Sequence, residues 1–202
     1  MSSRSEQVAT HPARDMHNIA DWFRHLTQEN LTQVFHAIND LKEVIPGLED
    51  LAASEFGLGV RVFHAKMKTH GKPLKQPSPR DEPDGLLLEE LSEGQRTLIA
   101  LYLLLHCHLV DDATLVLDEP DNFIALAEIQ PWLMKFLDRA DELNAQVVFI
   151  SHHPELLNQL AARGGVIFDR PNDGPTRVRP FDPADDSGLT PAELIARGWE
   201  GV

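Results

Sequence analysis

Apolar residues recur at helical spacing over several stretches of the chain. In residues 18–45 they fall three or four positions apart, which predicts one or two amphipathic helices with a break near residues 27–30. Pro46-Gly47 then ends this helical segment. The same spacing returns in residues 98–105 and 129–143, so two further helices are expected there.

Short apolar runs separate the helices and predict strands. The turn residues Gly57-Leu58-Gly59 join two such runs into a β-hairpin, which is placed within residues 50–75. Leu115–Leu117 and Gln146–Ile150 are continuous apolar runs, which are typical of parallel strands buried on both faces. The remaining runs predict three shorter strands at residues 86–88, 166–168 and 176–179.

The order of these elements predicts an α/β fold class. We expect a mainly parallel sheet with helices on both faces, preceded by helices and the β-hairpin. Residues 1–17 have no periodicity and are expected to fray, so the folded part is predicted to span residues 18–202, with the alternating core in residues 86–202. A chain of 202 residues with 42% hydrophobic content suits one domain with a hydrophobic core.

The charge and the cysteine content narrow the classes of function. A formal net charge of −14 argues against a surface that is basic overall, as in a nucleic-acid-binding protein. Residues 64–75 are locally basic, and they form either a solvated hairpin face or a contact for DNA or an acidic partner. The single cysteine, Cys107, excludes an internal disulfide, and no apolar run has the length of a membrane span. With no signal-peptide pattern in residues 1–14, these features predict a cytoplasmic protein without membrane contact.

Ser92 lies directly before an apolar run with helical spacing, so it is predicted to stand at the N-terminus of that helix. Backbone N–H groups and the positive end of the helix dipole favour an anion such as phosphate at this position. The run Leu91-Ser92-Glu93-Gly94-Gln95 is therefore either a phosphate contact or a simple helix cap.

Asp118 and Glu119 follow the apolar run Leu115–Leu117 directly, at the end of a strand where ligands of open α/β sheets bind. One carboxylate can hold Mg²⁺, directly or through water, and the adjacent carboxylate can orient an attacking water. An isolated Asp-Glu pair is more often a solvated strand end, so this interpretation depends on the neighbouring motifs.

Three motifs in series resemble those of ABC-type ATPases, and in particular the RecF/SMC-like predicted ATPases of the AAA_21 type. Leu91–Gln95 is similar to the signature motif of that family, and Leu115–Pro120 is similar to Walker B with its catalytic glutamate. Asp121-Asn122 falls where the family has its D-loop, and Val147–His152 resembles the strand and switch histidine of the same family. Order and spacing agree over residues 91–153.

The resemblance implies a P-loop NTPase fold that binds ATP and Mg²⁺ and hydrolyses ATP. It implies that Asp118 helps to hold Mg²⁺ through its water shell and that Glu119 polarises the water that attacks the γ-phosphate. His152 is implied to contact that phosphate as a switch.

The resemblance also implies a head-to-head dimer. Ser92, Gly94 and Gln95 are then expected to cover the γ-phosphate of ATP bound to the other subunit, while Asn122 touches the facing subunit. Glu93 departs from the glycine that is commoner in transporter signatures, and it adds negative charge near the phosphate.

The sequence contains no P-loop of the form Gly-x-x-x-x-Gly-Lys-Ser/Thr. Its single Gly-Lys pair, Gly71-Lys72, is followed by Pro73, and Lys66 stands where the first glycine is needed. The chain therefore resembles the C-terminal half of such an ATPase, whether as an excised piece, the product of a truncated gene or one subunit of a split enzyme.

The resemblance and the missing P-loop leave two possible functions. The first is an ATP-dependent dimerisation switch in DNA repair, chromosome maintenance or phage defence, which is inactive alone and competent with a Walker A half. The second is a non-catalytic interaction module that pairs with another ATPase head.

Overall fold

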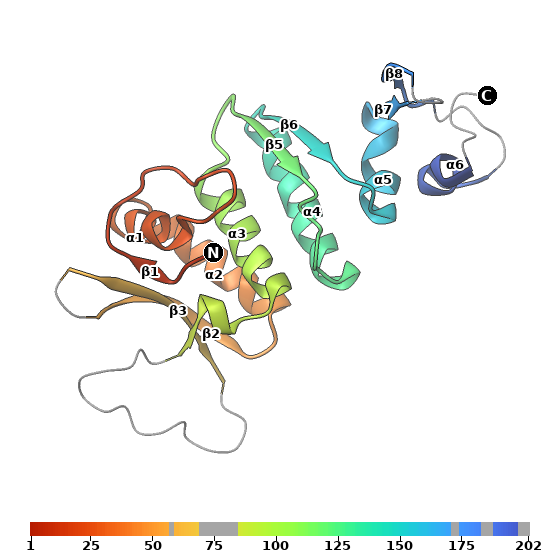
Figure 1. Cartoon of the computed structure of the whole chain (residues 1–202). Coiled ribbons are helices and arrows are strands. Elements are labelled where there is room, and N and C mark those ends of the chain that lie inside the picture. Colours follow the sequence, from red (N-terminus) through yellow and green to blue (C-terminus); the bar gives the residue numbers. More distant parts are fainter. Residues whose placement is uncertain (57–58, 69–84, 171–173, 183–187, 198–202) are drawn as a thin grey trace. The chain divides into compact units, whose positions relative to one another are not determined.

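The computed structural model describes the chain except for residues 57–58, 69–84, 171–173, 183–187 and 198–202 (Figure 1). The described residues divide into two compact units. The first contains residues 1–115 and 122–148, and the second contains residues 116–121 and 149–202. Helices and small sheets are mixed along the chain, which confirms the α/β character in general terms.

Two helices, α1 (Ile19–Glu29) and α2 (Leu31–Val44), open the first unit. Asn30 separates them, because it is both the C-terminal cap of α1 and the residue before α2. The break therefore falls within the region where the sequence predicts it. Each helix buries one apolar face, which includes Trp22 and Phe23 of α1.

The predicted hairpin consists of β2 (Leu48–Glu55) and β3 (Arg61–Met67), which pair antiparallel. The short strand β4 (Leu86–Leu87) also pairs antiparallel with β3 and leads into a turn of 3₁₀ helix, η1 (Leu88–Glu90). The ring of Phe63 on β3 stacks on that of Phe23 with 4.1 Å between ring centroids, which packs the hairpin onto α1.

The N-terminal residues contain a short strand within the range 1–17, where the sequence predicts fraying. The strand β1 (Arg4–Ser5) pairs antiparallel with β3, and the side chain of Ser5 is buried. The backbone N–H of Ser3 donates to the Glu89 carboxylate at 2.8 Å. These contacts use mainly backbone groups, so no apolar pattern in the sequence reports them.

Helix α3 (Glu93–Cys107) is the centre of the first unit. Its residues 98–105 are all buried, whereas the sequence suggests a single apolar face. The reason is that α3 packs against α2 on one side and against α4 (Leu126–Glu142) on another (Figure 1). The indole N–H of Trp132 on α4 donates to the carbonyl of Leu101 at 3.1 Å, which satisfies a buried polar group at this contact.

The strands β5 (Thr114–Asp118) and β6 (Gln146–Ile150) pair in a two-stranded sheet. They run in the same direction, because Gln146 N–H donates to Ala113 at one end and Glu119 N–H donates to Ile150 at the other. The prediction that both are fully buried is wrong, since Val116 and Ile150 are 58% and 50% exposed. The remaining sheets are small and antiparallel, so a mainly parallel sheet is not shown among the described residues.

The second unit contains α5 (Pro154–Leu160), η2 (Ala161–Arg163), β7 (Val166–Asp169), β8 (Arg177–Pro180) and α6 (Pro191–Arg197). β7 and β8 pair antiparallel, as the sequence predicts. A small core of Ala161, Phe181 and Leu194 holds these elements together. Thr190 and Glu193 exchange hydrogen bonds in a capping box at the start of α6, which explains where that helix begins.

Candidate functional site

The carboxylate of Glu119 and the imidazole of His152 form a contact between the loops that follow β5 and β6. Nδ1 of His152 lies 2.8 Å from Oε1 and 2.7 Å from Oε2 of Glu119. Both side chains belong to the second unit. An ionised carboxylate accepts only, so Nδ1 must carry the proton of this hydrogen bond. The structure thus brings together two of the predicted site residues that are 33 positions apart in the sequence.

The local backbone aims Glu119 at this contact. Its N–H donates to the carbonyl of Ile150 at 2.7 Å, which is the last hydrogen bond between the two strands. Its φ angle is +49°, a left-handed value that is uncommon for a residue with a β-carbon. Because strained backbone is retained mainly where the surroundings or a function require it, this value marks the turn after β5 as a functional candidate.

The electrostatics of the pair favour a charged histidine. The hydrogen bond to Glu119 and the negative charge of that carboxylate raise the pKa of His152 above its ordinary value. The His152 side chain is 81% exposed and that of Glu119 is 29% exposed, so an incoming ligand can reach both. The arrangement can hold a proton or a water molecule at the carboxyl ends of β5 and β6.

Asp118, the last residue of β5, has an exposed side chain. Within the described part of the chain, its carboxylate forms no hydrogen bond or ion pair. The described residues also contain no group of three or more histidine, cysteine, aspartate or glutamate side chains that could hold a metal ion. The donor set therefore fits Mg²⁺ in one way, with Asp118 as a single carboxylate beside water and substrate phosphates.

A second contact between the same two loops was not predicted from the sequence. The hydroxyl of Ser151 donates to Oδ1 of Asp121 at 2.9 Å, and Asp121 is only 5% exposed. The hydroxyl oxygen also accepts the N–H of His153 at 2.9 Å. An acidic residue in a turn is ordinarily solvated, so only the burial of Asp121 reveals its partner.

Ser92 caps α3, as the sequence predicts. Its Oγ accepts the N–H of Gln95 at 3.2 Å, and the Gln95 side chain accepts the N–H of Ser92 at 3.0 Å. This reciprocal capping box satisfies two backbone donors at the helix N-terminus. Ser92, Gly94 and Gln95 belong to the first unit, whereas Asp118, Glu119 and His152 belong to the second.

Gly94 lies against the loop that carries Asn122. A β-carbon added to Gly94 would lie 2.4 Å from the carbonyl oxygen of Phe123, which is too close for any side chain. Asn122 itself is exposed, and Phe123 is 74% exposed with a φ angle of +68°. The first turn of α3 and residues 122–124 therefore form one local surface within the first unit.

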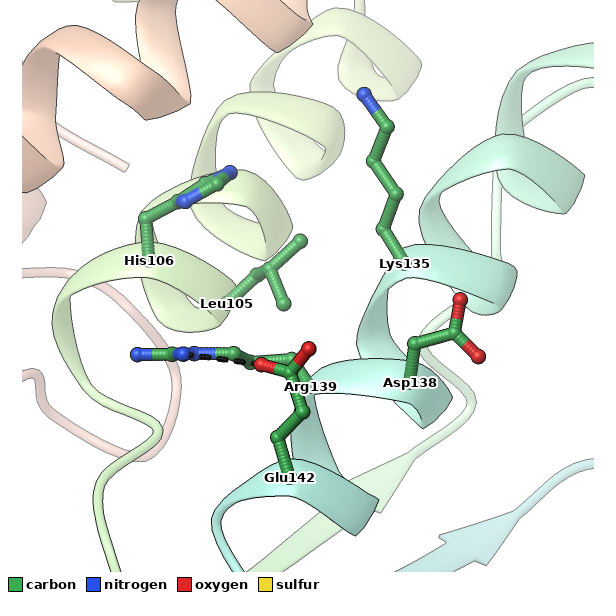
Figure 2. A pocket seen from close by; sticks show the side chains of 6 residues that line it. All are labelled: Leu105, His106, Lys135, Asp138, Arg139 and Glu142. Carbon is green, nitrogen blue, oxygen red and sulfur yellow. Dashed lines mark hydrogen bonds and ion pairs between the residues drawn. The ribbon is translucent and has the colours of Figure 1, made fainter.

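A hollow between α3 and α4 is an unsuitable nucleotide site. Figure 2 shows that its lining carries both signs of charge: Leu105, His106, Lys135, Asp138, Arg139 and Glu142. Arg139 pairs with Glu142, and Lys135 pairs with Asp40 of α2 at 2.7 Å. Asp40 also accepts from His106 at 2.9 Å. Because these charges already neutralise one another, we assign the cluster a structural role that joins three helices.

The locally basic segment 64–75 is only partly described. His64 is fully buried, so the prediction that it shares an exposed basic face is wrong. Nδ1 of its ring lies 3.2 Å from the carbonyl oxygen of Val62. His70, Lys72 and Lys75 lie outside the described residues, and the DNA contact stays a prediction.

Residues 61–158 match a family model described as "AAA domain, putative AbiEii toxin, Type IV TA system". This match spans just under half of the 202 residues and contains the signature-like run, the Asp-Glu pair and His152. This part of the chain is thus similar to AAA-type ATPase domains, which bind and hydrolyse nucleotides. No curated protein matches the sequence. Over the described residues, no helix has the length and apolar character needed to cross a membrane.

Proposed function

We propose that this chain supplies the Walker B, signature and switch-histidine elements of an ABC-type, RecF/SMC-like ATPase. In this proposal it acts as an ATP-dependent dimerisation switch once a P-loop is supplied to it. The observation that carries the proposal is the Glu119–His152 contact at the carboxyl ends of β5 and β6. The family match over residues 61–158 supports it independently.

Three residues of the second unit have distinct roles in the proposed hydrolysis: Glu119, His152 and Asp118. Glu119 accepts a proton from the attacking water, because its carboxylate is half-buried and lies at a strand end where the substrate is expected. His152 holds the Glu119 carboxylate in place until the γ-phosphate arrives and then donates to that phosphate. Asp118 would help to hold Mg²⁺ through its water shell, and the ion would supply positive charge beside the phosphates.

The first unit supplies the other half of a composite site in this proposal. The N-terminus of α3 presents Ser92, Gly94 and Gln95 to ATP held by a second copy, and Asn122 faces that copy. The close approach of Gly94 to Phe123 supports this part, because it makes the signature-like turn and the D-loop-like turn a single surface.

Exposed apolar faces support the need for a completing polypeptide. Val166, Phe168 and Val178 are 54%, 72% and 59% exposed on β7 and β8. Phe168 pairs with Val178 across the two strands, so their side chains lie on one face of the hairpin. Ile167 of β7 packs against the small core of the second unit, whereas the apolar side chains on the open face favour a second covering layer. We propose that the P-loop half provides this layer.

A non-catalytic interaction module is the second candidate, and the absence of a P-loop from the sequence favours it. ATP binding separates the two functions. The full chain is mixed with a polypeptide that carries a P-loop, for which the coding region directly upstream is the first candidate, and ATP binding and dimer size are measured.

The switch predicts ATP binding only in the mixture, together with an ATP-dependent dimer that Ser92→Arg abolishes. Ser92→Arg places bulk at the phosphate-facing turn, whereas Thr97→Arg on the next turn of α3 is the matched control. A dimer that forms equally well without ATP, and that Ser92→Arg does not affect, supports the interaction module instead.

A further inference from the structure

Asp121 is only 5% exposed, although it lies in the turn after β5. A buried carboxylate is costly unless hydrogen bonds compensate for the lost hydration. Here the Ser151 hydroxyl donates to Oδ1 of Asp121 at 2.9 Å, from a loop that is 30 positions away in the sequence. The turn after β5 is therefore tied to the loop after β6 by a buried contact that is separate from the Glu119–His152 pair.

Ser151 also contacts the backbone of His153, the residue that follows His152. Its Oγ accepts the N–H of His153 at 2.9 Å. The ring of His153 then accepts the N–H of Glu155 at 3.2 Å and caps α5, so the loop is also fixed to the start of that helix. His152 thus lies between Ser151 and His153, which a chain of hydrogen bonds links to Asp121.

The side chain of His152 has little else to orient it. It is 81% exposed, and it contacts the Glu119 carboxylate through Nδ1. An exposed imidazole without a fixed backbone would sample several rotamers and lose this contact. Glu119 and Asp121 lie two residues apart in the turn after β5. This turn therefore provides the hydrogen-bond partner of His152 and also the contact that restrains the 151–153 loop.

We propose that Asp121 is a positioning residue, which acts through Ser151 to hold the 151–153 loop so that His152 meets Glu119. The proposal deepens the proposed function and rests on it for the roles of Glu119 and His152 in hydrolysis. The positioning itself is a property of the free chain and can be measured without nucleotide. The negative charge of Asp121 also contributes, after Glu119, to the raised pKa of His152, in agreement with this proximity.

The tautomer of His152 is the direct readout. In the wild-type chain Glu119 requires the proton on Nδ1, whereas a free imidazole exchanges between both tautomers. We propose to record ¹⁵N imidazole shifts of the full chain at about pH 9, well above the ordinary histidine pKa of about 6.5. His152→Gln identifies the signal among the 10 histidines. The exchange rate of the His153 amide is measured in parallel.

Four variants test the proposal. Asp121→Ala and Ser151→Ala should abolish the Nδ1–H signature of His152 and speed exchange of the His153 amide by about five- to tenfold, the loss expected for one hydrogen bond. Asp121→Asn keeps an acceptor for Ser151 and should retain the signature. Asp169→Ala, an exposed carboxylate on β7 of the same unit, is the matched control and should change neither value.

Retention of the Nδ1–H signature in Ser151→Ala, or its loss in Asp169→Ala, would overturn the proposal. Ser151→Ala keeps the test decisive if Asp121→Ala fails to fold, because it removes the same hydrogen bond without a new cavity at Asp121. The outcome is independent of hydrolysis. If the signature behaves as expected while the completed protein does not hydrolyse ATP, the positioning role holds and the proposed function fails.

Discussion

Gly94 on α3 and the carbonyl oxygen of Phe123 approach so closely that a β-carbon on Gly94 would lie only 2.4 Å from that oxygen. The contact joins the first turn of the helix to backbone rather than to a flexible side chain. The glycine is therefore required by packing within the first unit, whether or not a nucleotide is bound nearby.

Gly94→Ala should lower the free energy of unfolding by about 1–3 kcal/mol, the usual cost of forcing extra atoms into a packed site. Helix propensity alone predicts the opposite sign, because alanine stabilises a helix by about 1 kcal/mol relative to glycine. Chemical denaturation of both proteins measures the difference. Glu93→Ala, at the exposed neighbouring position, is the control and should change stability by less than about 0.5 kcal/mol. A stabilised Gly94→Ala variant would contradict the contact.

Ser92→Ala should destabilise the chain by about 1 kcal/mol through loss of the cap on α3, without any nucleotide present. Ser92→Asp keeps an oxygen that can accept the Gln95 N–H, and it should retain most of the stability. Equilibrium denaturation of the three proteins is the measurement. Equal losses in the alanine and aspartate variants would show that the hydroxyl has another structural role.

The Glu119–His152 pair should make stability depend on pH in a defined direction. The pKa of His152 is raised in the folded chain, so its stabilising contribution is fully present below the ordinary histidine pKa of about 6.5. That contribution is lost as the pH rises through the raised pKa. An NMR titration should show the pKa of His152 falling toward the ordinary value in Glu119→Gln. An unchanged pKa in that variant would mean that the contact does not form in solution.

Asp40 should contribute more to stability than the neighbouring Glu43, although both pair with Lys135. Asp40 is 19% exposed and also accepts from His106, whereas Glu43 is 71% exposed. We expect Asp40→Ala to cost about 1–3 kcal/mol and Glu43→Ala less than about 1 kcal/mol. Thermal or urea denaturation of the two variants at neutral pH makes the comparison, and equal losses would contradict it.

The same carboxylate gives a pH test. Burial raises the pKa of Asp40, but hydrogen bonds from Lys135 and His106 outweigh it and leave the pKa below its ordinary value. The stabilisation is therefore present above the ordinary aspartate pKa of about 3.9 and is lost as the pH falls through the lowered value. The free energy of unfolding of Asp40→Ala should therefore fall less at acidic pH than that of the wild-type chain, because the contribution of the Asp40 carboxylate is already missing.

The helices of the first unit could be predicted from the sequence because their apolar periodicity is long and their ends carry local signals. Asn30 separates α1 from α2, and Ser92 lies directly before α3, where its side chain satisfies a backbone donor. These signals depend on residues three or four positions apart. A single sequence therefore contains the information that is needed to predict these helices and their ends.

The environment of β5 and β6 could not be predicted in the same way. A short apolar run looks alike whether one or both of its faces are covered, so the exposure of Val116 and Ile150 could not be read from their residue types. The Asp121–Ser151 contact could not be predicted from the sequence for a related reason. It joins residues from separate loops, and nothing local distinguishes a buried aspartate from a solvated one.

The Glu119–His152 contact could be predicted only in part from the sequence. The sequence identified both residues by their resemblance to ATPase motifs, but spacing alone gives no distance between them. Their contact depends on the pairing of β5 with β6, which ends at the hydrogen bond from Glu119 N–H to Ile150. The structure thus adds the geometry that makes the functional hypothesis testable.

Steady-state ATP hydrolysis with and without Glu119 tests the central claim most directly. The isolated chain should show no turnover that depends on Glu119, because its sequence lacks the P-loop that would hold the triphosphate. With a P-loop polypeptide supplied, turnover should appear, and Glu119→Gln should reduce it by roughly 10²- to 10⁴-fold while ATP stays bound. Near-normal turnover in the completed Glu119→Gln protein would contradict the account, as would turnover by the isolated chain that Glu119→Gln abolishes.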